Sequence, residues 1–249
     1  MNVIVCVKRV PDTETRIRIG EDGRSMEVTG VKFIMSPYDE YAVEAALRCK
    51  EAAGDGDVRL VTLGQTDSQE TLRQGLAMGA DSAVLLVGDV TADGLATAKA
   101  LVAELEGTDA PLILFGVKAA DDDQQQVGPM VATLMGRACV TGVVSFEVSG
   151  DVVRCHKEVE GGSEVIEATL PAVLTITKGA YDPRYASLKG IMAAKRKPLD
   201  EKAAAAMEGR LEVVSLSPPP DRAAGKIVGT GPDAVPELVR LLREEANAI

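Results

Sequence analysis

The chain has 249 residues, a net charge of −11 and a hydrophobic fraction of 46%. This length suffices for one large domain or two small ones, and this hydrophobic fraction is typical of a folded soluble protein. The negative charge argues against a general affinity for nucleic acid or for an anionic membrane. The sequence contains no run of 18 apolar residues, so it predicts no membrane-spanning helix.

The beginning of the chain and its cysteines limit the compartment and the chemistry. The first residues enter a predicted strand directly, without a visible secretory or transit segment, which favours the cytoplasm of a prokaryote; the alternative is a processed organellar form. The cysteines Cys6, Cys49, Cys139 and Cys155 form no C-x-x-C pair and the chain has one histidine, so no metal site is expected. Cys155 and His156 are adjacent on a predicted strand and point to opposite faces, so they cannot form a catalytic pair.

The first 135 residues alternate between predicted strands and helices. Short β-branched runs predict strands at 2–7, 58–63, 82–87 and 111–115. Apolar periodicity and capping residues predict helices at 37–53, with Ser36 as N-cap, at 67–76, from about Thr91 to Glu106, and over the apolar positions from Val127 to Met135. Residues 15–19 and 25–28 alternate in polarity around a glycine turn, which predicts a hairpin. The βαβ order predicts an α/β fold, a mostly parallel sheet with helices on both faces.

The remaining residues have a different pattern. Strands are predicted at 140–148, 152–159, 164–168 and 172–176, extending the sheet antiparallel at one edge. Beyond residue 180 the sequence predicts an arm, with a basic amphipathic piece at 191–197, an alanine-rich helix at 202–207, a strand at 211–216, a stiff proline linker and a helix at 232–247. We therefore expect a domain at 1–180 and an arm at 181–249, which has too little core of its own and must pack on the domain or on a partner chain.

The segment from Phe115 to Met130 is the candidate ligand site. It follows a buried strand, contains three aspartates and three glutamines, and leads into a helix whose first turn contains Pro129. Free N–H groups around Gln125 to Gly128 would bind a phosphate; the alternative is that Asp121 to Asp123 only cap the helix. Loops 7–13, 62–66 and 115–128 all leave carboxyl ends of parallel strands and can converge on one crevice.

Several motifs, in this order, resemble the β subunit of the electron transfer flavoproteins. They are Val5-Cys-Val-Lys-Arg-Val-Pro-Asp12, Gly30-Val-Lys-Phe-Ile-Met-Ser-Pro-Tyr-Asp39 with Ala42-Val-Glu-Ala-Ala-Leu47, Gln69-Glu-Thr-Leu-Arg73, Leu76-Ala-Met-Gly-Ala-Asp81, the Asp121–Pro129 loop, Leu170-Pro-Ala-Val-Leu-Thr175 and Pro183-Arg-Tyr-Ala-Ser-Leu-Lys-Gly-Ile-Met192. The resemblance implies a fold of the adenine-nucleotide-binding type and a heterodimer whose α subunit carries the redox-active FAD. The pair would take electrons from flavoprotein dehydrogenases, such as those of fatty acid oxidation, to a membrane quinone reductase, and the β subunit would catalyse nothing itself.

The resemblance also implies an AMP site and a flavin that the β subunit helps to enclose. The implied cofactor-binding residues are Cys6, Ser36, Thr62, Leu63, Gly64, Gly116, Asp123, Gln125, Gln126, Val127 and Gly128. Ser36 stands where many members have Asn. The Val127-Gly128-Pro129 sequence is shared with electron-bifurcating members, which bind a second FAD in place of AMP and oxidise NADH. The aspartate run and the segment from Pro183 to Lys197 are similar to the AMP-binding type, which we favour. The remaining alternative is an adenine-nucleotide sensor of the stress-protein type, which would need no arm.

Two further sets of residues are implied by the resemblance. The partner-docking residues, with which the β subunit would contact dehydrogenases, are Leu188, Lys189, Ile191, Met192, Lys195, Arg196 and Lys197. An exposed Leu188 would act as a hot spot and the basic residues would steer an acidic partner; the alternative is an ordinary solvated helix end. Glu158 would contact the flavin domain of the α subunit, although it could be a plain surface residue. Thr13 stands where some members place a Tyr near the flavin.

Overall fold

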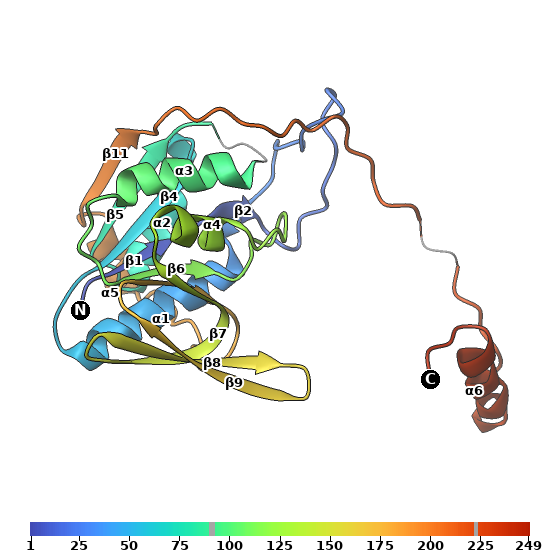
Figure 1. The fold of residues 1–249 in the computed structure, drawn as a ribbon. Coiled ribbons are helices and arrows are strands. Elements are labelled where there is room, and N and C mark those ends of the chain that lie inside the picture. Colours follow the sequence, from blue (N-terminus) through green and yellow to red (C-terminus); the bar gives the residue numbers. More distant parts are fainter. Residues whose placement is uncertain (90–92, 222–223) are drawn as a thin grey trace. The chain divides into compact units, whose positions relative to one another are not determined.

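The computed structural model describes residues 1–89, 93–221 and 224–249. These residues form two compact units, Met1–Ser215 and Leu216–Ile249. The larger unit contains an α/β sheet and its helices, and the smaller one contains a short helix at the C-terminus (Figure 1). No helix of the described residues is long and apolar enough to cross a membrane.

Within the described residues, nine strands form one sheet that is parallel over most of its width. In spatial order they are β11 (Leu199–Ala203), β5 (Ser82–Val87), β4 (Val58–Gly64), β1 (Val3–Cys6), β6 (Leu112–Gly116), β10 (Ala172–Ile176), β7 (Ala138–Ser149), β8 (Val152–Val159) and β9 (Gly162–Thr169). Neighbours from β11 to β7 are parallel, and β7, β8 and β9 pair antiparallel at the edge. A small antiparallel sheet joins β2 (Arg9–Pro11) to β3 (Phe33–Met35).

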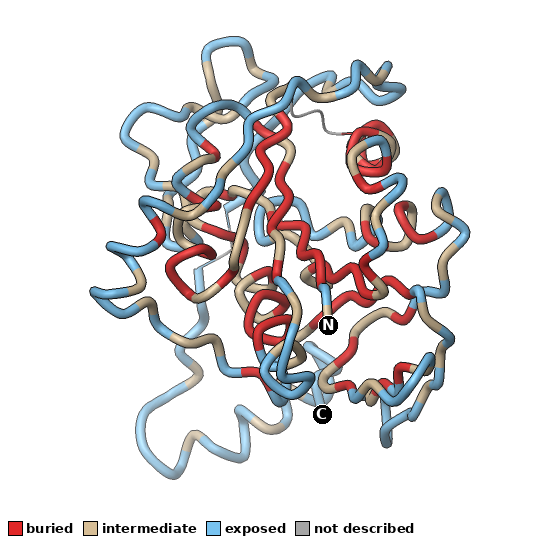
Figure 2. The backbone as a smooth tube through the Cα atoms, turned by 90° about the vertical axis from the view of Figure 1, so that its left-hand side faces the viewer, coloured by how far each residue is buried: buried red, intermediate tan, exposed pale blue. Residues whose placement is uncertain are grey.

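Helices cover both faces of the sheet, as the sequence predicts. They are α1 (Pro37–Ala53), α2 (Gln69–Met78), α3 (Gly94–Leu105) and α4 (Val127–Leu134), with a 3-10 turn at Thr66–Ser68 before α2. Helix α5 (Leu188–Ala194) packs against α2. The smaller unit contains α6 (Val235–Glu244), after a 3-10 turn at Pro232–Ala234. Side chains alternate along β1, so that Val3 and Val5 pack against α1 and α2, whereas Ile4 and Cys6 pack against α3 and α4. Figure 2 shows buried backbone concentrated in these central strands and on the helices facing them.

Most element bounds agree with the prediction, and α1, β5 and β8 agree to the residue. Strand β10 differs in its neighbours, because it lies between β6 and β7 and is parallel to both, rather than in the antiparallel edge. All five of its residues are buried, which is the pattern of a strand covered on both faces. The predicted start of α3 near Thr91 lies outside the described residues; the helix begins at Gly94, after the capping residue Asp93.

Two predicted elements are wrong, and a third forms only in part. The hairpin at 15–28 is reduced to its turn and one antiparallel bridge, between Ile19 and Met26, because a two-stranded ribbon with an exposed Ile17 has little core to stabilise it. The alanine-rich helix at 202–207 does not form: residues 202 and 203 end β11, whose pairing with β5 overrides helix propensity, and residues 204–207 have no regular structure. The strand at 211–216 does not form, and its side chains Leu211 and Val214 are exposed.

Candidate functional site

The carboxyl ends of β1, β4 and β6 lie side by side at one edge of the sheet. Cys6 is in register with Val61 on one neighbour and with Phe115 on the other, so the loops after these strands leave from the same edge. A cleft lies there, as the converging loops predict. Its lining residues are Cys6, Val7, Lys8, Asp39, Leu63, Gly94, Thr97, Leu101, Phe115, Gly116, Val117, Lys118, Ala119, Asp122, Gln124, Gln125, Gln126, Val127, Gly128, Pro129 and Thr175.

The cleft brings together most of the residues that the resemblance implies for cofactor binding. Those that line it are Cys6, Leu63, Gly116, Gln125, Gln126, Val127 and Gly128. Burial raises the pKa of the Cys6 thiol, so this side chain is a neutral apolar wall rather than a nucleophile. The other implied residues, Ser36, Thr62, Gly64 and Asp123, do not line the cleft.

These four residues lie behind or beside the cleft wall. The buried Thr62 hydroxyl donates to the carbonyl oxygen of Val7 at 2.7 Å and so ties β4 to the end of β1. Ser36 occupies the N-cap position of α1, as predicted, but its hydroxyl does not cap the helix, and it has no hydrogen-bond partner among the described residues. Gly64 packs so closely on Ser68 that a Cβ would overlap it.

The N-terminus of α4 faces the cleft. Gln126 is its N-cap residue, and no side chain in the described part of the chain caps this end by a hydrogen bond. The predicted alternative, in which Asp121 to Asp123 cap the helix, is therefore wrong. Gly128 lets the first turn approach β10, because a Cβ there would lie 2.8 Å from Cγ2 of Thr175. An uncapped helix start can receive an anion through its N–H groups and its dipole.

The loop before α4 is held in an unusual backbone conformation. Asp123 and Gln125 have φ values of 52° and 56°, in the left-handed region that non-glycine residues seldom adopt. Such residues cost of order 1 to 3 kcal/mol each and persist only where the surroundings enforce them. The geometry turns Gln124, Gln125 and Gln126 onto the cleft wall, where Gln126 also approaches Gly94 at the start of α3.

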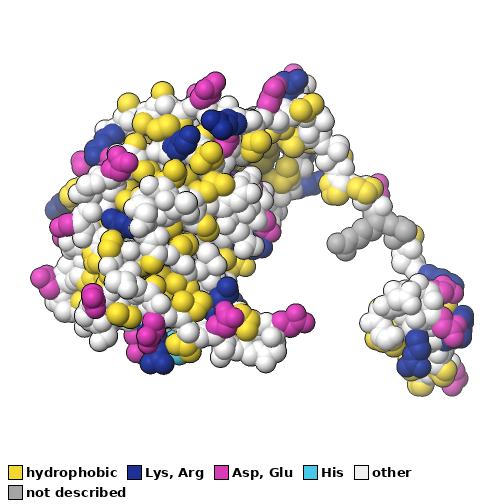
Figure 3. All heavy atoms as spheres, in the orientation of Figure 1, with side chains coloured by type: hydrophobic (Ala, Val, Ile, Leu, Met, Phe, Trp, Pro, Cys, Tyr) yellow, Lys and Arg dark blue, Asp and Glu magenta, His cyan; other side chains and the backbone are white. Residues whose placement is uncertain are grey.

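Two lysines form ion pairs with the three aspartates of this loop and offset most of their charge. The Lys8 ammonium lies 2.8 Å from carboxylate oxygens of both Asp121 and Asp122, and Lys118 lies 2.8 Å from Asp123. Burial alone would lower the pKa of Lys8, but its hydrogen bonds to the two carboxylates raise it above its usual value. The aspartates therefore repel a bound anion less than their number implies. Figure 3 shows acidic and basic side chains interspersed on one face of Met1–Ser215.

Asp39 is a central residue of the cleft that the sequence analysis did not single out. Its carboxylate accepts the backbone N–H of Lys8 at 2.7 Å and that of Gly116 at 3.0 Å, so one side chain from α1 joins the ends of β1 and β6. Burial raises the pKa of Asp39 to about 7. An aspartate in a first helical turn normally indicates a dipole contact, and only the packing of α1 on the sheet reveals this one as a tie.

The segment around α5 presents an exposed apolar surface. Tyr185, Leu188, Ile191 and Met192, here called the apolar patch, have exposed fractions of 99%, 84%, 44% and 64%. Lys189, Lys195 and Arg196 are exposed beside it. Lys197 differs, because its ammonium donates to the carbonyl oxygens of Leu76 and Ala80 at the end of α2. Six of the seven predicted docking residues are thus exposed on or next to α5, whereas Lys197 has a contact inside the unit.

Glu158 and Thr13 are both exposed. Glu158 lies near the end of β8, opposite Ser163 of β9, and Thr13 lies in the turn after β2. Neither belongs to the cleft lining. Their predicted contacts with a flavin domain stay predictions.

Comparison with known proteins places these features in one family. The model of the electron transfer flavoprotein domain matches residues 25–207. The chain is 40% identical to an electron transfer flavoprotein subunit beta of Bradyrhizobium diazoefficiens and 38% identical to that of Bacillus subtilis, with all of each chain covered. It is 36% identical, again over both full lengths, to the mitochondrial subunit beta of Arabidopsis thaliana. The chain therefore belongs to the electron transfer flavoprotein β-subunit family.

Proposed function

We propose that this chain binds AMP in the cleft and pairs with an α subunit whose FAD carries the electrons. The observation that carries the proposal is the uncapped start of α4, with Gln126, Val127 and Gly128 facing a cleft at the carboxyl ends of parallel strands. Backbone N–H groups there suit a phosphate. The apolar wall formed by Leu63, Leu101 and the neutral Cys6 suits an adenine ring.

The partner is inferred from the relatives and from the C-terminal arm. The relatives are named as subunit beta, which implies an α subunit. The Leu216–Ile249 unit has little core of its own, because Val235 and Leu238 of α6 are exposed and Leu241 is its only buried residue among those described. We infer that this unit packs on the α subunit and completes the flavin site, with Glu158 and Thr13 near the flavin domain.

The apolar patch suggests which partner delivers electrons to the complex. An exposed Leu188 with basic neighbours suits an apolar pocket that has an acidic rim on a flavoprotein dehydrogenase. We infer that the α-subunit FAD accepts electrons there, as in fatty acid oxidation, and passes them to a membrane quinone reductase. In this role the chain is an electron-carrier subunit without a catalytic site, working in a prokaryotic cytoplasm.

A second candidate function is electron bifurcation, in which the cleft binds a second FAD and the complex oxidises NADH. The Val127-Gly128-Pro129 sequence at the start of α4 favours it. The three aspartates with their lysine partners and the segment from Pro183 to Lys197 favour AMP instead.

Counting flavins separates the two candidates. The purified complex with its α subunit is expected to contain one FAD per heterodimer and one extractable AMP, because the cleft then holds the smaller nucleotide. The measurement is the flavin absorbance per mole of heterodimer, with chromatography of the acid-released nucleotides. Two flavins per heterodimer and no AMP would establish the bifurcating alternative. One flavin and an empty cleft would refute both.

A charge at the start of α4 is expected to weaken AMP binding. Gln126→Glu places a carboxylate in the cleft lining, where it competes with the phosphate for the helix start and repels it. We expect at least about a tenfold loss of affinity, since a like charge at close range costs more than about 1.4 kcal/mol. The measurement is calorimetric titration of AMP into the nucleotide-depleted heterodimer.

Asp121→Asn is the matched control for this variant. Asp121 lies outside the cleft lining, and Lys8 keeps Asp122 as a partner after the change. We expect its affinity to stay within about twofold of the unmodified complex, because a partly exposed ion pair contributes little. The reverse order of the two variants would reject the placement of the phosphate at Gln126.

A further inference from the structure

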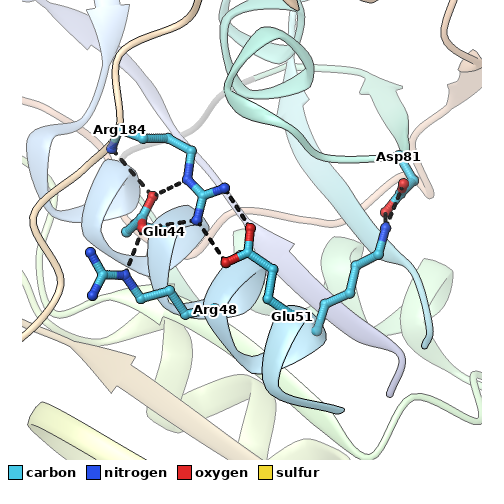
Figure 4. Close-up of polar contacts among 6 residues, drawn as sticks. Glu44, Arg48, Glu51, Asp81 and Arg184 are labelled. Atoms are coloured by element: carbon cyan, nitrogen blue, oxygen red, sulfur yellow. Dashed lines mark hydrogen bonds and ion pairs between the residues drawn. The ribbon is translucent and has the colours of Figure 1, made fainter. Parts of the chain in front are cut away.

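Arg184, just before the apolar patch, is clamped between two carboxylates of α1 (Figure 4). Its guanidinium donates to Glu44 at 2.7 and 3.1 Å and to Glu51 at 2.6 and 3.2 Å, and its backbone N–H also donates to Glu44 at 3.2 Å. A planar guanidinium that meets two carboxylates through paired hydrogen bonds is fixed in direction as well as in position. The segment is thus fastened to α1 at its beginning.

The burial of Glu44 makes loss of its contact with Arg184 energetically unfavourable. The residue is 1% exposed, and it also accepts a hydrogen bond from Arg48 at 2.7 Å. Burial alone would raise the pKa of Glu44, but the hydrogen bonds from Arg184 and Arg48 outweigh burial and lower it. A buried carboxylate that loses its partners is strongly destabilising, so the native state favours Arg184 in its clamp.

The other end of the segment is fastened to α2 in two directions. Arg73 of α2 donates to the carbonyl oxygens of Ala194 and Lys197, at 2.5 and 2.9 Å, and so caps the end of α5. Lys197 in turn donates to Leu76 and Ala80 at the end of α2. Cations at helix C-termini are favourable because they meet unpaired carbonyls and the negative end of the dipole. Arg73 of α2 therefore caps the C-terminal end of α5, and Lys197, which follows α5, caps the C-terminal end of α2.

The middle of the segment lies directly on α2. A Cβ at Gly190 would lie 2.5 Å from the carbonyl oxygen of Ala77, so the two backbones touch there, and Ala194 is buried against the core. One side of α5 is therefore seated, while Leu188 and Met192 extend into solvent.

We propose that Arg184 and Arg73 are positioning residues that hold the apolar patch in the conformation a partner dehydrogenase binds. This inference rests on the proposed docking function. A patch that is ordered before binding avoids the entropy cost of ordering it in the complex. If the patch were competent only about a tenth of the time, its apparent affinity would fall about tenfold even though the bound complex kept the same interface.

The test compares variants of the full chain, assembled with its α subunit, as acceptors for a flavoprotein dehydrogenase that the unmodified complex oxidises. Arg184→Gln and Arg73→Gln are expected to raise the KM for the complex about tenfold, with kcat unchanged, because docking weakens while the flavin is untouched. Arg184→Lys keeps the charge and loses the paired geometry, so it is expected to restore part of the loss. Arg48 remains beside Glu44 in these variants, which protects the fold.

Hydrogen exchange distinguishes positioning from general destabilisation. The amides of 184–197 are expected to exchange faster in Arg184→Gln and Arg73→Gln, while those of α1 and the central strands keep their rates. Arg59→Gln is the matched control, because it removes an ion pair of similar length, 2.7 Å, between β4 and Glu104 of α3. It is expected to leave both the KM and the exchange of 184–197 unchanged.

Leu188→Ala tests the docking function separately. It is expected to raise the KM without faster exchange in 184–197, because it shortens the side chain that the partner binds and leaves the seat intact. If it raises the KM while Arg184→Gln and Arg73→Gln behave like Arg59→Gln, the positioning proposal is overturned and docking stands. If it leaves the KM unchanged, the docking function fails, and the positioning proposal fails with it.

Discussion

Gly116→Ala is expected to lower the free energy of unfolding by about 3 kcal/mol, the upper part of the range for overpacked interiors. The new Cβ would overlap Oδ1 of Asp39 and lie 2.8 Å from the backbone nitrogen of Asp39 and from the carbonyl carbon of Tyr38. Backbone atoms at a helix start cannot move as a flexible side chain does. The strain therefore falls on the contact between α1 and β6.

The same change is expected to disturb the cleft. Asp39 accepts the N–H groups of Lys8 and Gly116, so a shift of its carboxylate strains both loops that line the cleft. Chemical denaturation gives the free energy, and AMP titration shows the loss of affinity. Gly162→Ala is the control, since a Cβ on this β9 glycine meets nothing within 4 Å, and we expect it to stay within about 0.5 kcal/mol. A Gly116→Ala variant as stable as this control would contradict the packing argument.

The fold could be predicted where local pattern and tertiary environment agree. Helix α1 has proline in its first turn and apolar residues on one side, and β8 lies between turns that contain Gly150 and Gly161, so each has the predicted bounds. The prediction of a helix at 202–207 is wrong because alanine favours a helix only locally. The edge of β5 offers backbone hydrogen bonds to residues 199–203, and these decide the structure. A local sequence pattern does not determine which strands are neighbours in a sheet. For this reason the sequence predicts β10 at the antiparallel edge, although it lies between β6 and β7.

The local sequence pattern predicts the backbone part of the candidate site, and the family resemblance adds Cys6 and Leu63. Gly116 and Gln125 to Gly128 follow a predicted strand and precede a helix, so the sequence alone places them at the edge where ligands bind. Asp39 and Lys8 depend on contacts across 77 and 113 residues of sequence. The ion pairs of Lys8 and Lys118 with the loop aspartates could not be predicted, because the local sequence shows only a run of carboxylates and not which cations lie near them in the fold.

Asp39 is expected to make stability fall as the pH rises from about 4 to about 7. Its pKa is about 7 in the folded protein, raised from 3.8 by burial, even though the N–H groups of Lys8 and Gly116 oppose the rise. Because the folded pKa lies above the unfolded one, the folded state binds the proton more tightly across this interval. The stabilisation is complete below about pH 4 and is lost as the pH rises through the folded pKa.

Asp39→Asn is expected to remove this dependence, since the amide does not titrate. The amide also places an N–H donor where a carboxylate accepted one, so the variant carries a constant penalty for an unsatisfied buried group. The measured quantity is the difference in free energy of unfolding between the unmodified chain and the variant, from urea denaturation at intervals from pH 4.5 to pH 8. This difference is expected to shrink with rising pH, by on the order of 3 kcal/mol between pH 4.5 and pH 8, while contributions common to both proteins cancel.

Asp12→Asn supplies the control of opposite sign. The hydrogen bond from Lys32, together with the N–H of Glu14, holds the pKa of Asp12 below its usual value. A lowered pKa gives stability that is present above the unfolded value and lost only as the pH falls below it, so the same difference for Asp12→Asn should be flat from pH 5 to pH 8. A flat difference for Asp39→Asn as well would show that Asp39 is ionised in the folded protein throughout this interval. The tie between β1 and β6 would then be an anion held by two N–H donors, and the cleft would meet a phosphate with the full negative charge of Asp39.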